Sequence, residues 1–238
     1  MECRNCNTVF EGNFCNNCGQ KAGEKRFMLS NLPVEFLHGF YHVHSGFLFT
    51  IRELFIRPGE TLRGYIYGKR VSYFHPFTFL LLISLVGGFL YKWAGVTEHL
   101  NDNLLASGDT VRFTGKYFSY RMLLAIPAYA LICSILYRPF KYNLAEHLIV
   151  NTFLISQSIV LLIVWLLITI VVKPVGVVFE ILYISAFCSL IIYQVLVFFR
   201  LFNTGSTFLR WLKALATVLI GLGLSFLLMN YLVKIVYL

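Results

Sequence analysis

The chain has 238 residues, of which 58% are hydrophobic and 13% are charged, and its mean hydropathy is +0.72. Soluble domains are typically about 45–50% apolar and about 25% charged, so this composition excludes an ordinary soluble domain and indicates a protein with several membrane spans. The formal net charge of +9 would suit nucleic acid, but cytoplasmic loops of membrane proteins also accumulate Lys and Arg.

The first twenty residues contain two Cys-x2-Cys pairs with eight residues between them. This spacing places four thiolates on two short turns, which is the ligand set of a closed structural zinc site. Asn7 and Gly19, which directly follow the two pairs, suit the positive φ angle that such turns need. Redox-active pairs are the main alternative. We therefore expect a zinc ribbon over residues 1–25, with zinc bound by Cys3, Cys6, Cys15 and Cys18.

The expected ribbon also bears on partners and processing. No Lys or Arg lies between Asn7 and Phe14, which disfavours nucleic acid as a partner. The ribbon could instead bind a cytoplasmic protein partner, or it could stabilise the neighbouring interfacial helices. Residues 1–12 contain no apolar stretch, so we expect no cleavable signal peptide.

Residues 26–75 mix aromatic and basic side chains without an apolar run long enough to span a bilayer. Pro58 and Gly59 interrupt the segment, which predicts two or three amphipathic helices at the cytoplasmic interface. A small soluble helical domain is the alternative. The large apolar residues that recur at near-helical spacing are Phe36, Phe40, Phe47, Ile51, Leu54 and Phe55.

The stretch "GYIYGKRVSYFHPF" (64–77) ends this segment and places Lys69 and Arg70 beside the first apolar run. Basic and aromatic residues at this depth are typical of a cytoplasmic anchor. The alternative is a site for a lipid phosphate or another anion, because Arg binds phosphate through two parallel hydrogen bonds.

Residues 76–238 form the expected transmembrane helical bundle. A helix needs about 20 apolar residues to cross roughly 30 Å of hydrocarbon. Pro127 lies inside the second candidate and predicts a kink there. Five apolar runs meet or approach the required length: 76–93, 120–137, 145–172, 176–199 and 211–238. The fold class is therefore an all-α integral membrane protein with about five transmembrane helices, preceded by interfacial helices and the zinc ribbon.

The third apolar run opens with "YNLAEHLIV" and carries Glu146, His147 and Asn151. Ionisable groups close to hydrocarbon are costly, so they usually pair with one another or face the protein interior. We expect Glu146 to pair with Arg70 or with Arg138, and His147 and Asn151 to share one helix face. The site is either structural or a ligand site. Polar contacts between helices are also expected of Glu180, Gln194 and Asn230.

The distribution of charge gives the orientation. With five spans, fourteen of the twenty Lys and Arg residues fall on the same side of the membrane as the N-terminus, and six fall on the opposite side. By the positive-inside rule the N-terminus is cytoplasmic, and with five spans the C-terminus and the loop 98–119 are external. The reducing cytoplasm would also keep the four thiols free to bind metal.

Three stretches together resemble an uncharacterised bacterial family of multi-pass membrane proteins with an N-terminal zinc ribbon, known as a domain of unknown function. They are "FCNNCGQ", "RPGETLRGYIYGKRVSYFHPFTFLL" and "YNLAEHLIV". The resemblance implies the bacterial inner membrane and the same architecture. It implies no activity, and it directs attention to Gly68, Lys69, Arg70, Glu146 and His147.

The sequence carries no nucleophile–base set and no phosphate-binding Gly loop, so an enzyme is disfavoured. The favoured function is a non-enzymatic membrane module that docks a partner or organises the membrane interface. One alternative is a transporter, channel or lipid-handling protein that uses the polar face of the third span. With only five spans, a transporter would be expected to form a homo-oligomer. The other alternative is an enzyme that acts on lipid headgroups through Glu146 and His147.

Overall fold

The protein is all-helical in the part of the chain that the structure describes, in agreement with the expected fold class. The computed structural model describes residues 1–23, 26–33, 46–96, 118–203 and 205–237, and it describes side chains in these ranges except at 118–122, 229–230 and 232–237. Within these ranges β structure is limited to two isolated bridges, Glu2 with Val9 and Phe14 with Lys21.

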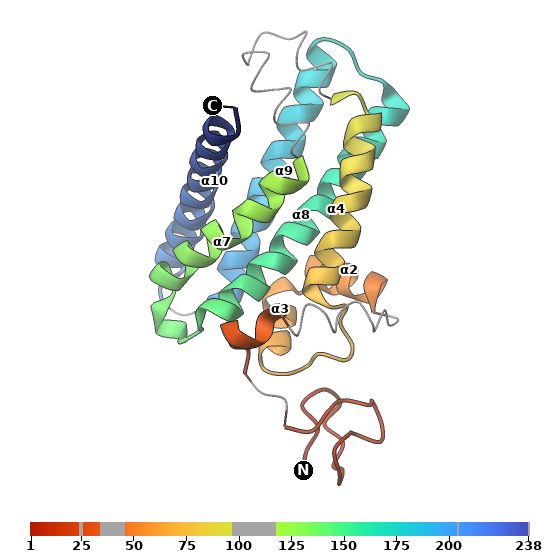
Figure 1. Cartoon of the computed structure of the whole chain (residues 1–238), viewed down its shortest axis with the longest axis vertical. Coiled ribbons are helices and arrows are strands. Elements are labelled where there is room, and N and C mark those ends of the chain that lie inside the picture. Colours follow the sequence, from red (N-terminus) through yellow and green to blue (C-terminus); the bar gives the residue numbers. More distant parts are fainter. Residues whose placement is uncertain (24–25, 34–45, 97–117, 204, 238) are drawn as a thin grey trace.

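Long helices run side by side and form the body of the molecule (Figure 1). They are α4 (Pro76–Trp93), α7 (Phe118–Leu136), α8 (Leu144–Val172), α9 (Val177–Leu201) and α10 (Thr207–Tyr237). Helix α8 packs against α4, α7 and α9, and α10 packs against α7 and α9. The side chains of α8 are buried almost without interruption from Ala145 to Ile159, so this half of α8 is the centre of the bundle.

Four helices are long and apolar enough to cross a membrane: Pro76–Trp93, Leu144–Val172, Val177–Leu201 and Thr207–Leu228. They correspond to four of the five expected spans. The remaining one, α7, has a fully described apolar part of only Leu123–Leu136 and holds Pro127 inside it, as the sequence predicted. At about 1.5 Å per residue, the 29 residues of α8 extend about 43 Å, so α8 must tilt or reach beyond the hydrocarbon.

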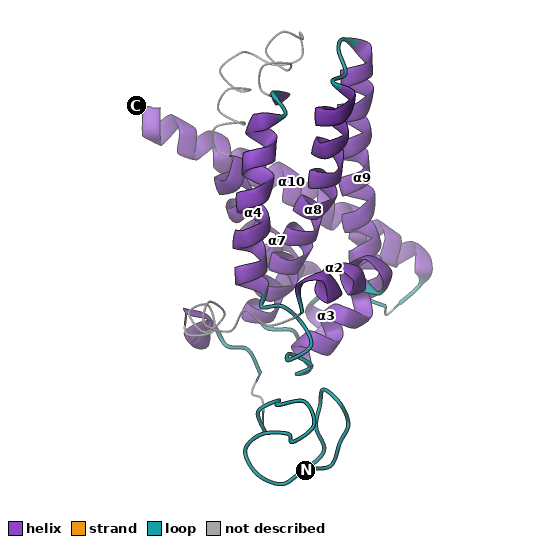
Figure 2. Ribbon diagram, turned by 90° about the vertical axis from the view of Figure 1, so that its right-hand side faces the viewer, coloured by secondary structure: helices purple, strands orange, loops and turns teal. Residues whose placement is uncertain are grey.

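Helices α2 (Phe47–Ile56) and α3 (Pro58–Ile66) lie across one end of the bundle, on the same side as the N-terminal cysteine region (Figure 2). Helix α2 buries Thr50, Glu53 and Leu54, while Leu48 and Ile56 are exposed. An apolar outer face at the end of a membrane bundle suits a helix that lies in the interface. The expected apolar positions Phe36 and Phe40 lie outside the described residues.

Helix α3 is fixed tightly to the C-terminal end of α9. A Cβ atom at Gly59 would lie 2.5 Å from the Arg200 carbonyl oxygen, so only glycine permits this approach. Arg63 Nη1 donates hydrogen bonds to the carbonyls of Arg200 (2.8 Å) and Leu201 (2.7 Å). These bonds satisfy carbonyl groups that the end of α9 leaves unpaired, and a positive charge at a helix C-terminus is favourable. Helix α3 is therefore part of the bundle and not of a separate body.

Candidate metal centre and interface chamber

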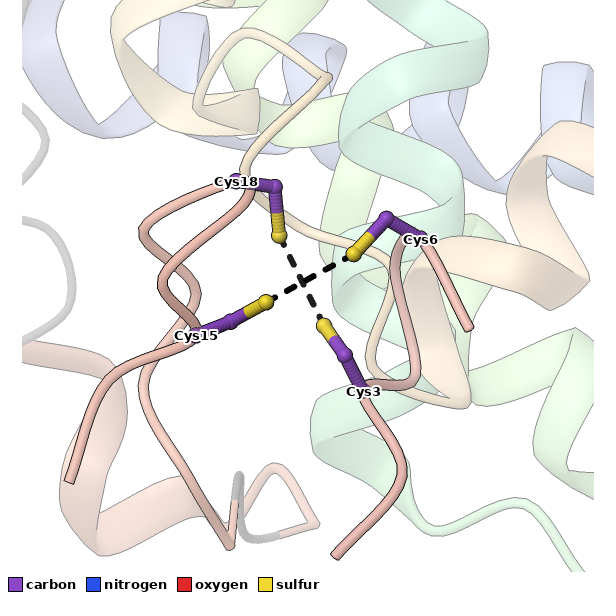
Figure 3. A group of neighbouring side chains, drawn as sticks. All are labelled: Cys3, Cys6, Cys15 and Cys18. Carbon is purple, nitrogen blue, oxygen red and sulfur yellow. Dashed lines mark hydrogen bonds between the residues drawn. The ribbon is translucent and has the colours of Figure 1, made fainter. Parts of the chain in front are cut away.

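The four N-terminal cysteines converge on one point (Figure 3). All four sulfur atoms lie within 4.8 Å of one another, with Cys3–Cys18 at 3.5 Å and Cys6–Cys15 at 3.6 Å. A disulfide would require about 2.05 Å, so these are free thiols. Four sulfurs that each lie about 2.3 Å from a tetrahedral metal are separated by about 3.8 Å from one another, so the cluster fits such an ion.

The backbone explains why the cluster forms. Each Cys-x2-Cys pair closes a turn, in which Asn7 N–H donates to the Cys3 carbonyl at 2.9 Å and Gly19 N–H donates to the Cys15 carbonyl at 2.8 Å. Asn7 has a φ angle of 59° and Gly19 one of 73°. Both angles lie in the left-handed region that Gly and Asn tolerate best, as the sequence predicted.

The environments of the thiols differ. Hydrogen bonds with the side chain and the backbone of Thr8 lower the pKa of Cys6 to about 6, whereas burial raises the pKa of Cys18 to about 11. The Cys6 sulfur lies 3.3 Å from the Thr8 hydroxyl. A thiolate is the form that binds metal, so the lowered pKa of Cys6 favours metal binding.

The cysteine region (residues 1–22) is docked on the loop that follows α3. Gln20 is buried; its side-chain amide donates to the Gly68 carbonyl, and its Oε1 accepts from Arg70 N–H at 3.3 Å. Ser72 Oγ lies 3.2 Å from Asn5 Oδ1. Gly68 has a φ angle of 109°, and a Cβ there would lie 3.0 Å from Arg4 Cδ. A side chain at position 68 would therefore disturb both the loop and its contact with the cysteine region.

A cavity of about 830 Å³, here called the interface chamber, lies between the cysteine region, α3 and the start of α8. Its charged lining consists of four cationic side chains and one carboxylate: Arg4, Arg26, Lys69, Lys141 and Glu146. Tyr67 and Tyr142 also line it. Burial raises the pKa of Tyr142, so this phenol stays neutral and can donate a hydrogen bond.

Glu146 serves two purposes at the first turn of α8. It forms a capping box with Asn143: Glu146 N–H donates to Asn143 Oδ1, and Asn143 N–H donates to Glu146 Oε2, both at 2.9 Å. Its carboxylate, 1% exposed, also accepts from Arg26 Nε at 2.5 Å and from Arg26 Nη2 at 2.8 Å. The hydrogen bond from Arg26 to Glu146 raises the pKa of the guanidinium. The carboxylate is therefore held by its own helix end and by a distant segment.

The expected pairing of Glu146 with Arg70 or Arg138 is not what the structure has. The guanidinium that holds Glu146 is that of Arg26, and Arg70 instead lies over the ring of Phe27, 3.6 Å from its centroid. Asn143 Nδ2 donates to the Phe27 carbonyl at 2.7 Å, which fixes residues 26 and 27 against the start of α8. Because Arg26 and Phe27 are adjacent, the same short segment contacts both Glu146 and Arg70.

His147 and Asn151 are buried on the inner face of α8. Asn151 Nδ2 donates to the His147 carbonyl at 2.8 Å, and the His147 ring lies near the rings of Tyr142 and Phe202. Within the described part of the chain, His147 Nδ1 and Asn151 Oδ1 have no hydrogen-bond partner. His147 is not among the residues that line the interface chamber. The structure thus brings Lys69 and Glu146 to one cavity, whereas His147 and Asn151 do not line it.

Sequence reasoning missed Arg4, Arg26 and Lys141. Nothing local in "CRNC", "GEKRF" or "RPFKY" distinguishes these cations from an ordinary cytoplasmic anchor. One signal was readable: Asn143 followed three positions later by Glu146 is a capping-box pattern. It would have placed the Glu146 carboxylate back at the helix end, where Arg26 reaches it. The contact between helices expected of Gln194 is present, because its Nε2 donates to Ser158 Oγ at 3.2 Å.

The fold and the site define an all-α membrane protein with a four-cysteine, metal-competent region docked on the loop that follows α3. Residues 44–87 match the model of a family described as "Protein of unknown function (DUF3667)". This stretch covers α2, α3, the loop with Lys69 and Arg70, and the first part of α4, so an uncharacterised domain coincides with one wall of the interface chamber. No curated protein and no solved structure matches the chain.

Proposed function

We propose that this is a non-enzymatic protein of the bacterial inner membrane that holds the anionic headgroup of a lipid in the interface chamber. The observation that carries the proposal is the charge of the chamber. Four cationic side chains and one carboxylate face the same cavity, beside helices long enough to cross a membrane. Basic residues at this depth attract anionic lipids by about 1 kcal/mol each.

The cysteine region has a structural part in this proposal. Its metal is zinc, bound by four thiolates, which leaves no open coordination position for catalysis. Docked through Gln20 and Asn5, it holds Arg4 at the chamber. The zinc ribbon thus organises the interfacial segment, which is one of the two roles that the sequence favours for it.

The orientation is part of the proposal: the N-terminus is cytoplasmic and the C-terminus external. The excess of Lys and Arg on the N-terminal side supports it. The described end of α10 lies at the opposite end of the bundle from the cysteine region, which also supports it (Figure 1). The interface chamber would then face the anionic cytoplasmic leaflet.

A second candidate function is the docking of a cytoplasmic protein partner by the cysteine region. The observation that favours it is the exposure of Val9 (76%) and Phe14 (61%) on so small a region. Apolar side chains exposed beside polar ones are typical of contact surfaces. This function and headgroup binding use different surfaces and are compatible.

The test is lipid retention by the purified protein, measured by native mass spectrometry after exchange into defined lipid. We expect phosphatidylglycerol to be retained over phosphatidylethanolamine, and the double variant Lys69→Gln, Lys141→Gln to weaken retention by about thirtyfold, from about 1 kcal/mol per lysine. The matched control is Lys92→Gln, Lys173→Gln, which removes the same charge from positions that do not line the chamber.

Two outcomes would count against the proposal. If both double variants retain phosphatidylglycerol equally, the chamber does not bind the headgroup. Competition by free glycerol phosphate, with no requirement for acyl chains, would instead identify a soluble anion as the ligand.

A further inference from the structure

A second cavity lies inside the bundle, far along the helices from the interface chamber. It has a volume of about 310 Å³ and is lined by residues of α7, α8, α9 and α10. Its lining residues sit near the middle of each helix: 125 and 129 in α7, 155–162 in α8, 187–194 in α9 and 222–226 in α10. This mid-helix cavity therefore lies at the depth of the hydrocarbon centre.

Its walls are aliphatic and aromatic, and its few polar groups already have partners. Tyr129 O–H donates to Gln194 Oε1 at 3.0 Å, Gln194 Nε2 donates to Ser158 Oγ at 3.2 Å, and Ser158 Oγ donates to the Leu154 carbonyl at 2.8 Å. Ser225 Oγ donates to the Leu222 carbonyl at 2.9 Å. The cavity thus demands no polar ligand, and most of its lining side chains are apolar.

The packing keeps this space open from within. Gly221 lies directly under the Tyr129 ring, where a Cβ would approach the ring to 2.6 Å. Tyr129 is also stacked on Phe198, with ring centroids 6.3 Å apart and planes 9° apart. Together with the hydrogen bond to Gln194, these contacts hold the ring as a rigid wall, so the side chain does not collapse into the cavity.

The entrance is on the outer surface of α9 and α10. Phe187 and Phe226 line the cavity and are also 49% and 56% exposed, so they form its rim. The surface beside the rim carries exposed apolar side chains, among them Ile184, Ile192 and Leu227. Because both helices have membrane-spanning length and composition, this opening faces hydrocarbon and admits only what the bilayer offers there.

We infer that the mid-helix cavity is a binding site for one acyl chain of a bilayer lipid, which enters sideways between Phe187 and Phe226. A cavity of about 150 Å³ accommodates benzene, so this one has room for about a dozen carbon atoms, a large part of one chain. The inference is independent of headgroup binding, because the two cavities share no lining residue.

The test is photocrosslinking in nanodiscs of phosphatidylcholine that carries a diazirine in the distal half of one chain. In the unmodified protein we expect adducts concentrated on the lining segments 155–162, 187–194 and 222–226. In Ile191→Trp, labelling of these segments should fall about fivefold or more, because the indole takes up the space of the chain. The matched control Ile192→Trp alters an exposed residue that does not line the cavity, and labelling should be unchanged.

Other results would overturn the inference. Adducts spread evenly over Ile181, Ile184 and Ile192 would mean ordinary lipid contact without a site. If the cavity is filled by a side chain of a second copy, labelling of the lining would be absent, and Ile191→Trp would instead dissociate an oligomer in size-exclusion chromatography. The labelling pattern of the unmodified protein decides the question even if Ile191→Trp fails to fold. The Lys69→Gln, Lys141→Gln variant should be labelled normally, which separates this site from the interface chamber.

Discussion

The contact between Arg26 and Glu146 gives the sharpest test of the structure, because it joins residues 120 positions apart. In Arg26→Gln the buried carboxylate keeps one donor, the Asn143 N–H, and loses two charge-assisted hydrogen bonds. Bonds to charged groups contribute about 1.5–3 kcal/mol, but the Arg26 side chain is 57% exposed, and water screens part of this. We expect the free energy of unfolding to fall by about 2 kcal/mol.

Glu146→Gln should cost less, about 1 kcal/mol, because a neutral amide can keep the capping contact and needs no counter-charge. The double variant should be about as stable as Arg26→Gln alone, which corresponds to a coupling energy of about 1 kcal/mol. The assay is unfolding of the purified variants in detergent, followed by tryptophan fluorescence.

Two controls use charges that the structure places differently. Glu53 and Arg57 form an ion pair at 2.7 Å with a similar exposure of 7% and 56%, but within four residues, so its coupling should be only about 0.3–0.5 kcal/mol. The effects of Arg70→Gln and Glu146→Gln on the free energy of unfolding should add, because these two side chains do not form a pair. The opposite result would be strong coupling between Arg70→Gln and Glu146→Gln, together with additive effects of Arg26→Gln and Glu146→Gln. It would refute the packing of residues 26 and 27 and support the pairing of Glu146 with Arg70 that was expected from the sequence.

Three further predictions concern other parts of the molecule. The double variant Cys15→Ser, Cys18→Ser should lose one bound zinc per chain, measured by metal analysis. Its cysteine region should become sensitive to proteolysis while the helices remain inserted. Unmodified protein that contains no zinc, or that contains stoichiometric iron, would refute this prediction. A reporter active only in the periplasm should give a signal at the C-terminus and none at residue 141, and the reverse would invert the topology. Gly59→Ala should destabilise the protein by about 1–3 kcal/mol through the clash with α9. Gly64→Ala in the same helix meets only ordinary contacts and should be neutral or stabilising. Equal effects of the two variants in thermal unfolding would argue against the α3–α9 contact.

Much of the fold could be predicted from sequence because its determinants are local. Apolar runs of sufficient length gave the membrane helices to within a few residues, and the cysteine spacing gave the cluster, including the positive φ angles of Asn7 and Gly19. The shortest and least certain of the expected spans, 76–93, is among the four helices that meet the length and composition of a membrane span. Helix α7 runs from Phe118 to Leu136 with Pro127 inside it, and its side chains are described only over 123–136, a stretch too short to test the second expected span.

The partners within the site could not be predicted, because they depend on how distant segments fold back. Local sequence does not distinguish three of the arginines. In the structure Arg26 pairs with Glu146, Arg63 caps α9 and Arg70 lies over Phe27. What separates them is the distant part of the chain that each one contacts. Single-sequence reasoning expected these charges near the membrane interface but had no means of assigning the partner of each one.

The position of Arg4 links the metal to the interface chamber. Arg4 lies between Cys3 and Cys6, so its place at the chamber depends on the folded cysteine region, and that region depends on its metal. If the chamber binds an anionic headgroup, loss of metal should remove one of the four cations, worth about 1 kcal/mol or about fivefold in affinity. By thermodynamic linkage, the headgroup must then increase the affinity for zinc by the same factor. A loss much greater than fivefold in the cysteine variant would mean that the cysteine region contributes more to the chamber than Arg4 alone.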